Sequence, residues 1–209
     1  GDTNGNPTLL NITMYAMLAV FVMIQIAICW RIFQYVNGIE YTGATASFLG
    51  MTYYTGITGA QLVGAVVSSG IFAGIGIIYG HELAHTKGFS FLIARWMMGL
   101  SGSAHFCYAH VYNHHLELGC ENDPATAPRG RSLYAHLPKS HFGQSKFLYT
   151  MEKQRLKRLG VPFLSWQNRW IRGYAMSLPT IALFWYAGAW TGLACMALIW
   201  LISNFELEA

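Results

Sequence analysis

Histidine is concentrated in the middle of this 209-residue chain, where five of the eight histidines form two regularly spaced clusters. Neutral imidazole binds iron, zinc and copper through one ring nitrogen. Side chains four residues apart share one face of an α-helix, so each cluster can direct two imidazoles at the same ion. The five candidate metal ligands, which we also expect to form the catalytic centre, are His81, His85, His110, His114 and His115.

The second cluster ends in two adjacent histidines, His114 and His115. Successive residues of an α-helix lie about 100° apart, so we expect His115 to leave the face that His110 and His114 share and to reach a second ion. Five imidazoles exceed the three protein ligands of a catalytic mononuclear zinc site. They indicate two metal ions, or one ion with further ligands.

The first cluster also fits a different class of enzyme. His81, Glu82 and His85 form the HExxH pattern of zinc metalloproteases, in which the glutamate is the general base. A membrane zinc protease is therefore an alternative, as is a remnant without enzymatic activity. Metal analysis separates them, since two irons per chain favour an oxygenase and one zinc favours a protease.

Several polar residues near the clusters are open to two interpretations each. Glu82 and Asp123 could each orient a ligand by accepting an imidazole N–H, or be a surface carboxylate and the start of a turn, respectively. His105 could lie beside the ligands or simply be buried. We expect His136 and His141 to be surface or interface residues.

The composition indicates a membrane protein. Hydrophobic residues make up 54% of the chain and charged residues 11%, against roughly 25% charged residues in soluble domains. Two apolar stretches, residues 9–33 and 59–80, have the ~20 residues that a helix needs to cross a bilayer. A third, residues 174–204, is long for one helix, and Gly188 with Trp190 could break it in two.

The remaining segments connect or flank these spans. Residues 34–58 are rich in Gly, Thr and Tyr, which favours a re-entrant or interfacial connection. Residues 91–108 are apolar with a Gly-Ser-Gly interruption, which indicates a helix near the interface or buried in protein. Residues 117–167 look soluble. The sequence thus predicts an all-α, polytopic transmembrane bundle with a histidine-rich metal site at one end.

Basic residues are placed asymmetrically. Twelve of the thirteen Lys and Arg residues lie between Lys87 and Arg172, and Arg31 is the exception. Loops rich in Lys and Arg stay in the cytoplasm, so we expect the metal site on the cytoplasmic side and no nucleic acid as partner. The basic stretch from Lys139 to Arg172 could dock an acidic redox protein or contact lipid headgroups.

Two motifs carry a resemblance to a known family. HELAHTK at 81–87, followed by HVYNHH at 110–115, resembles the first two histidine motifs of the membrane fatty-acid desaturase and hydroxylase superfamily. Within it, residues 105–143 are most similar to the integral-membrane alkane monooxygenases, including the segment Asn-Asp-Pro-Ala-Thr at 122–126. Residues 1–7 also resemble a loop of that family. Ala109 and Asn113 replace its usual Glu and Gly, which leaves open whether the substrate is an alkane or an alkyl-aromatic such as xylene.

The resemblance implies a bacterial inner-membrane enzyme of six helices, with two non-haem iron ions held by the five histidines. It implies terminal hydroxylation of an alkane with O2 and electrons from rubredoxin; a desaturase or alkyl-aromatic hydroxylase is the alternative within the superfamily. It also implies that residues 1–209 form a single oxygenase domain that lacks the family's first membrane helices and its later histidines. We therefore expect this chain alone to bind metal weakly.

Overall fold

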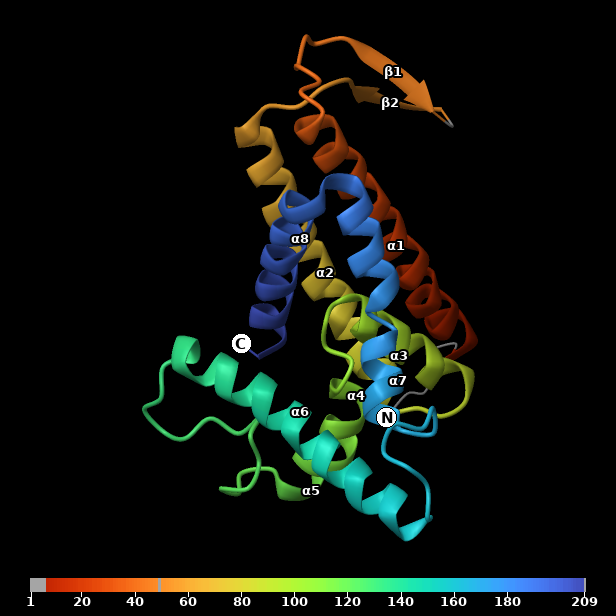
Figure 1. Ribbon diagram of the computed structural model, residues 1–209, viewed down its shortest axis with the longest axis vertical. Coiled ribbons are helices and arrows are strands. Elements are labelled where there is room, and N and C mark those ends of the chain that lie inside the picture. Colours follow the sequence, from red (N-terminus) through yellow and green to blue (C-terminus); the bar gives the residue numbers. More distant parts are fainter. Residues whose placement is uncertain (1–6, 49, 209) are drawn as a thin grey trace.

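The computed structural model describes residues 7–48 and 50–208, so most of the segment expected to resemble the family's loop lies outside the described residues. The structure is mainly helical (Figure 1). Its helices are α1 (Pro7–Val36), α2 (Gly59–Ala84), α3 (Phe89–Leu100), α4 (Phe106–Ala109), the π-helix η1 (His110–His114), α5 (His115–Glu117), α6 (Leu133–Arg158), α7 (Arg169–Ala175) and α8 (Leu178–Glu208).

Three helical segments of the described chain are long and apolar enough to cross a membrane. They comprise residues 8–36, 59–84 and 169–207. The first two match the predicted spans, and α2 packs against both α1 and α8. This arrangement confirms the expected polytopic helix bundle.

The third apolar segment changes direction inside α8. Gly188 and Ala189 have non-helical dihedral angles, and Ala189 has a φ of 46° and a ψ of −123°, a sparsely populated conformation that costs a residue with a Cβ about 1–3 kcal/mol. The chain turns back at this point, so the two halves of α8 lie beside each other (Figure 1). The predicted break near Gly188 is confirmed, and the return half brings the end of α8 back toward the histidine-rich region.

Small residues allow α2 and α8 to approach closely. A Cβ added to Gly70 would lie 2.7 Å from Cβ of Ile202, so only glycine fits without displacing the neighbouring helix. Close packing through small residues is a common way for helices to associate in lipid. The glycines of α2 therefore place the helix that carries His81 and His85 inside the bundle, as predicted.

The connection between α1 and α2 differs from the all-α prediction. It contains a two-stranded antiparallel sheet, β1 (Thr45–Phe48) and β2 (Met51–Tyr54), in which Thr45 pairs with Tyr54. Thr, Tyr and Phe favour extended backbone, and Gly50 supplies a positive φ of 78° in the turn. This hairpin lies at the end of the bundle opposite to α4, α5 and α6 (Figure 1).

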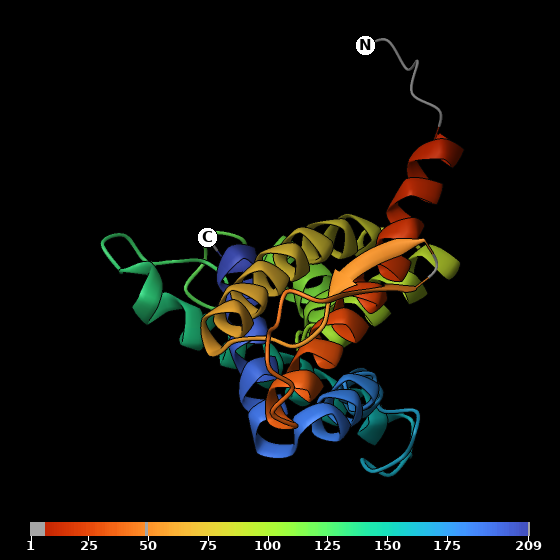
Figure 2. The ribbon, with the colours of Figure 1, turned by 90° about the horizontal axis from the view of Figure 1, so that it is seen from above.

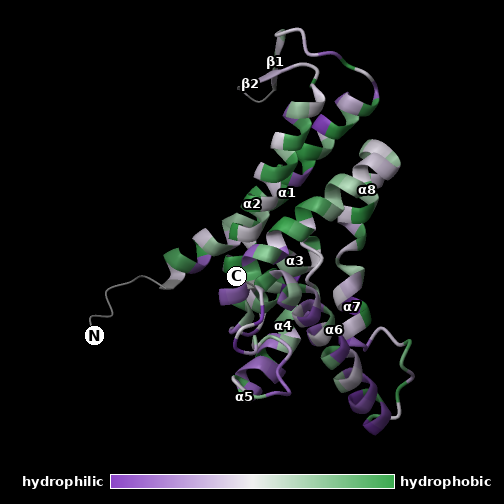
Figure 3. Ribbon diagram, turned by 90° about the vertical axis from the view of Figure 1, so that its left-hand side faces the viewer, coloured by the Kyte–Doolittle hydropathy of each residue, from purple (hydrophilic) through white to green (hydrophobic). Residues whose placement is uncertain are grey.

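The two ends of the long axis differ in polarity. Hydrophobic residues dominate α1 and α2, whereas α5 and α6 carry most of the hydrophilic ones (Figure 3). Viewed along the long axis, α6 runs beneath the apolar helices from one side of the bundle to the other (Figure 2). The histidine clusters lie at this polar end, next to the apolar spans.

Candidate metal centre

Three of the five predicted ligands, His81, His85 and His110, have ring nitrogens that all lie within 4.8 Å of one another, and His115 approaches His110 from the side. The Nε2 atom of His110 lies 2.8 Å from that of His81 and 3.0 Å from that of His115, and the Nε2 atoms of His81 and His85 are 3.3 Å apart. Metal–imidazole bonds of about 2.1 Å place neighbouring ligand nitrogens roughly 3 Å apart. The donor set and its spacing therefore fit a transition-metal ion.

The end of α2 supplies His81 and His85. Leu83 and Ala84, which lie between them in sequence, are buried and hold the opposite face of the helix against the core. His81 is half-buried and His85 is exposed. The same helical turn thus anchors itself on one side and presents two imidazoles on the other, as the four-residue spacing predicted.

The second cluster adopts a π-helix rather than the expected α-helix. The backbone N–H of His115 donates to the carbonyl oxygen of His110, five residues earlier, which is the π-helical pattern and is frequent at functional sites. In an α-helix these two residues would lie about 140° apart. The wider turn instead brings His115 toward the face of His110, with their Nε2 atoms 3.0 Å apart, and the expectation that His115 reaches a second ion stays a prediction.

His114 is held by a buried carboxylate. Its Nδ1 atom lies 2.7 Å from Oδ2 of Asp123, whose side chain is fully buried. Asp123 also accepts hydrogen bonds from the Thr126 hydroxyl and the Ala125 backbone N–H. A histidine that donates Nδ1–H to a carboxylate keeps Nε2 as a metal ligand with a fixed ring orientation. This direct contact supports the suggested role of Asp123 in positioning a ligand.

The charges of these groups suit a metal site. Burial and then the neighbouring imidazoles, His81 first, lower the pKa of His110 to about 3, so its ring is neutral and its lone pair is available near neutral pH. Burial by itself raises the pKa of Asp123, but its hydrogen bonds with Thr126, His114 and Ala125 outweigh burial and hold this pKa below the usual value. Asp123 is thus an anion facing the imidazole cluster.

The other histidines lie outside the convergence point. His105 is buried, and its Nδ1 atom lies 3.3 Å from the Tyr174 hydroxyl. His136 is also buried, with Nε2 3.2 Å from the Ala125 carbonyl oxygen, and the ring of the half-buried His141 packs 4.5 Å from that of His105. The prediction that His136 is a surface or interface residue was wrong, because this part of α6 faces the loop around Asp123 rather than water. The half-buried His141 leaves the same prediction open.

Two residues that help to shape the histidine site, Phe106 and Thr126, were not predicted from the sequence. The Phe106 ring stacks on His110, with centroids 4.6 Å apart and planes 16° from parallel, and it contacts His81 edge-on at 5.7 Å. Thr126 fixes the carboxylate of Asp123. The sequence features that could have indicated them are the His-Phe pair at 105–106 and the Thr three residues after Asp123. Glu82, which was considered for an orienting role, is exposed.

Residues 58–208 match the model of the family described as fatty acid desaturase. The chain belongs to this family. It is 28% identical to alkane 1-monooxygenase of Acinetobacter baylyi over 156 residues, which cover 69% of this chain and 38% of that protein. It is 31% and 34% identical to alkane 1-monooxygenases 1 and 2 of Pseudomonas aeruginosa, over 63% and 62% of this chain and 35% of each relative.

These matches confirm the family predicted from the histidine motifs. They favour an oxidoreductase over the zinc protease that HExxH alone would also allow. The chain spans between about a third and two-fifths of the length of the curated relatives it matches. The activity of the whole protein is therefore inferred from the site.

Proposed function

We propose that this chain belongs to a membrane-bound, non-haem di-iron monooxygenase that hydroxylates an unactivated C–H bond of a hydrophobic substrate, the terminal carbon of an alkane. The observation that carries the proposal is the convergence of imidazole nitrogens from α2 and from η1–α5, in which three pairs of Nε2 atoms are 2.8–3.3 Å apart. The curated relatives named alkane 1-monooxygenase support the substrate class.

Iron would be held by the Nε2 atoms of His81, His85, His110, His114 and His115, and would supply the activation of O2 that no side chain can provide. Iron binding requires neutral imidazoles, and the lowered pKa of His110 keeps its ring neutral near neutral pH. Asp123 fixes the ring of His114 through Nδ1. The buried Phe106 ring covers one side of His110 and His81 and keeps water from that face.

The surrounding elements suit the substrate and the electron donor of such an enzyme. An apolar substrate can enter laterally from lipid between the spanning helices. We place the site on the cytoplasmic side of a bacterial inner membrane, because the basic residues gather at the histidine end. The basic surface of α6 suits docking of an acidic, rubredoxin-type electron donor, since opposite charges raise encounter rates.

Metal content and product formation test this proposal together. The chain is purified from membranes, loaded with ferrous iron and assayed with alkanes and xylenes in separate reactions for the alcohol product. We expect weak but specific iron binding, and His110→Ala to lose iron and product, whereas His141→Gln, which removes a histidine outside the convergence point, keeps the iron. Binding of one zinc, with a protease activity that Glu82→Gln abolishes, would refute the proposal.

A further inference from the structure

A row of aromatic side chains leads from the exposed side of α6 to the histidine cluster. The Tyr149 ring lies 5.7 Å from that of Trp170, and Trp170 lies 5.0 Å from Tyr174. The rings of Tyr174 and His105 are 6.3 Å apart and 21° from parallel. These contacts join α6, α7 and the segment before α4 without a gap, and the proposed hydroxylation uses none of them.

The inner end of the row reaches a candidate iron ligand. His105 is followed in the chain by Phe106, whose ring stacks on His110 at 4.6 Å. The last step from His105 to the cluster therefore runs through one peptide unit and one stacked pair. An electron can pass between aromatic groups at such separations, because their π orbitals are in or near contact.

Tyr174 has a proton acceptor beside its hydroxyl. The oxygen lies 3.3 Å from Nδ1 of His105 and 2.7 Å from Oγ of Ser145, and Nε1–H of Trp170 donates to the same Ser145 oxygen at 3.3 Å. Burial, and then His141, lower the pKa of His105 to about 3, so the imidazole is neutral and one ring nitrogen is free to accept. A phenol that loses an electron becomes strongly acidic, and His105 can take its proton.

The outer end of the row is accessible and positively charged. Tyr149 is 39% exposed. Lys146 and Lys153, three residues before it and four after it on α6, lie on the same helix face and are exposed. Positive potential concentrates anions, so small anionic reductants such as ascorbate would meet the ring at this point.

We propose that this row is an exit path for oxidising equivalents from the metal centre. The proposal rests on the proposed function, because the oxidant is the centre after reaction with O2 when no substrate is bound. Phenol and indole rings lose electrons far more readily than they gain them. The row therefore conducts by releasing electrons toward the centre, and it is unsuited to carry electrons inward from a low-potential donor by being reduced.

Each step moves one electron. Tyr174 gives an electron to the oxidised centre and its phenol proton to Nδ1 of His105. Trp170 then returns an electron to the Tyr174 radical, which takes its proton back from His105. Tyr149 reduces the Trp170 radical and loses its own proton to water, and ascorbate finally supplies an electron and a proton to Tyr149. The net change is one electron from ascorbate to the centre and one proton from ascorbate to water.

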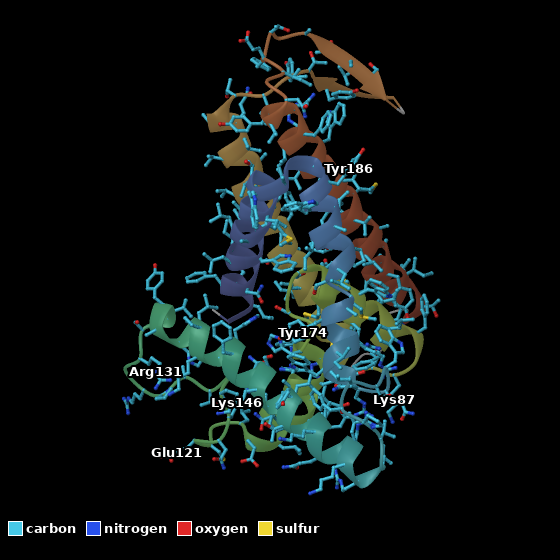
Figure 4. All side chains as sticks on the ribbon, in the orientation of Figure 1. Lys87, Glu121, Arg131, Lys146, Tyr174 and Tyr186 are labelled. Carbon is cyan, nitrogen blue, oxygen red and sulfur yellow. The ribbon has the colours of Figure 1, made fainter. Side chains whose placement is uncertain are left out.

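The test compares Tyr174→Phe with Tyr186→Phe. Tyr186 is 85% exposed and lies near the turn of α8, well away from Tyr174 (Figure 4), so its variant is a matched control. The full chain, loaded with ferrous iron in lipid nanodiscs, is mixed with O2 without substrate, frozen at intervals and examined by electron paramagnetic resonance. Mass spectrometry then measures oxygen atoms added to side chains near the cluster.

We expect wild type and Tyr186→Phe to show a transient tyrosyl radical that ascorbate quenches. Tyr174→Phe should lose most of this signal and accumulate oxidised side chains around His110, although it binds the same amount of iron. Tyr149→Phe should lengthen the lifetime of the inner radical, because the exit is blocked. These effects are expected only if Tyr174 transfers electrons, since a purely structural role of its hydroxyl would alter stability or iron content instead.

The outcomes separate this proposal from the proposed function. If the chain binds iron and forms alcohol, but Tyr174→Phe matches wild type in radical yield and oxidative damage, the exit path is refuted and the hydroxylase stands. If the chain binds no iron, the proposed function and the exit path fail together.

Discussion

Replacing Asp123 by asparagine should weaken metal binding without removing any ligand. The carboxylate accepts hydrogen bonds from His114 and Thr126 on Oδ2 and from the Ala125 N–H on Oδ1. An amide has the same shape but only one acceptor oxygen. If this oxygen faces His114, the NH2 group faces the Ala125 N–H; if the amide is flipped, the NH2 group faces His114. One pair of donors must therefore oppose each other in either orientation.

The expected loss of iron affinity follows from these contacts. A hydrogen bond to a charged group contributes about 1.5–3 kcal/mol, and loss of a partner that orients a ligating histidine lowers metal affinity about 10–100-fold. This range corresponds to ~1.4–2.8 kcal/mol. We therefore expect iron affinity of Asp123→Asn to fall by about one to two orders of magnitude, because His114 is no longer held with Nε2 toward the cluster.

The assay is iron titration of the chain in nanodiscs, with thermal unfolding of the iron-free protein measured alongside it. Glu121→Gln is the control, since Glu121 is an exposed acid two residues away (Figure 4). It changes the net charge equally and should bind iron as wild type does. Asp123→Asn protein that binds iron with unchanged affinity would refute the positioning role, and a lower unfolding temperature alone would assign Asp123 to loop structure.

Three further variants test the packing and electrostatics. Gly70→Ala should lower the stability of the bundle by about 1–3 kcal/mol, measured by unfolding in detergent, because its Cβ collides with α8. Gly143→Val should weaken iron binding, measured by titration, by pushing Pro124 and the adjoining carboxylate loop. Burial alone raises the pKa of Glu152, but the hydrogen bond from Arg155, with further contacts, lowers it overall. Its stabilisation is therefore complete above about pH 4.5 and is lost as the pH falls toward the folded-state pKa, and Glu152→Gln should abolish this part of the acid sensitivity in unfolding curves.

The apolar spans and the histidine clusters could be predicted because each depends on local pattern. Length and hydropathy define α1 and α2, and the four-residue spacing of His81 and His85 is enough to place both on one face. The turn at Gly188 followed from a segment too long for one crossing. The family resemblance, and not the HExxH pattern alone, favoured an oxygenase over a zinc protease.

The wrong predictions concern features that depend on contacts between residues far apart in the sequence or on local backbone geometry. The short hairpin after α1 depends on pairing between two strands of four residues each, which a membrane-oriented pattern does not reveal. His136 is covered because α6 packs over the loop that carries Asp123, and sequence spacing does not show this. The π-helix was missed because its extra residue per turn leaves no mark in composition.

The widened turn at His110–His114 has a consequence for insertions and deletions. Adjacent histidines at its end serve two directions, one ring joining the convergence point and the other meeting a carboxylate. Loss of a single residue within the turn would place the last histidine four residues after His110, so a regular α-helix and not a π-helix would be needed to keep it on the same face, even though every histidine would still be present. The motif is therefore defined by its count of residues as much as by their identity, and a relative with the same letters at a different spacing would build a different site.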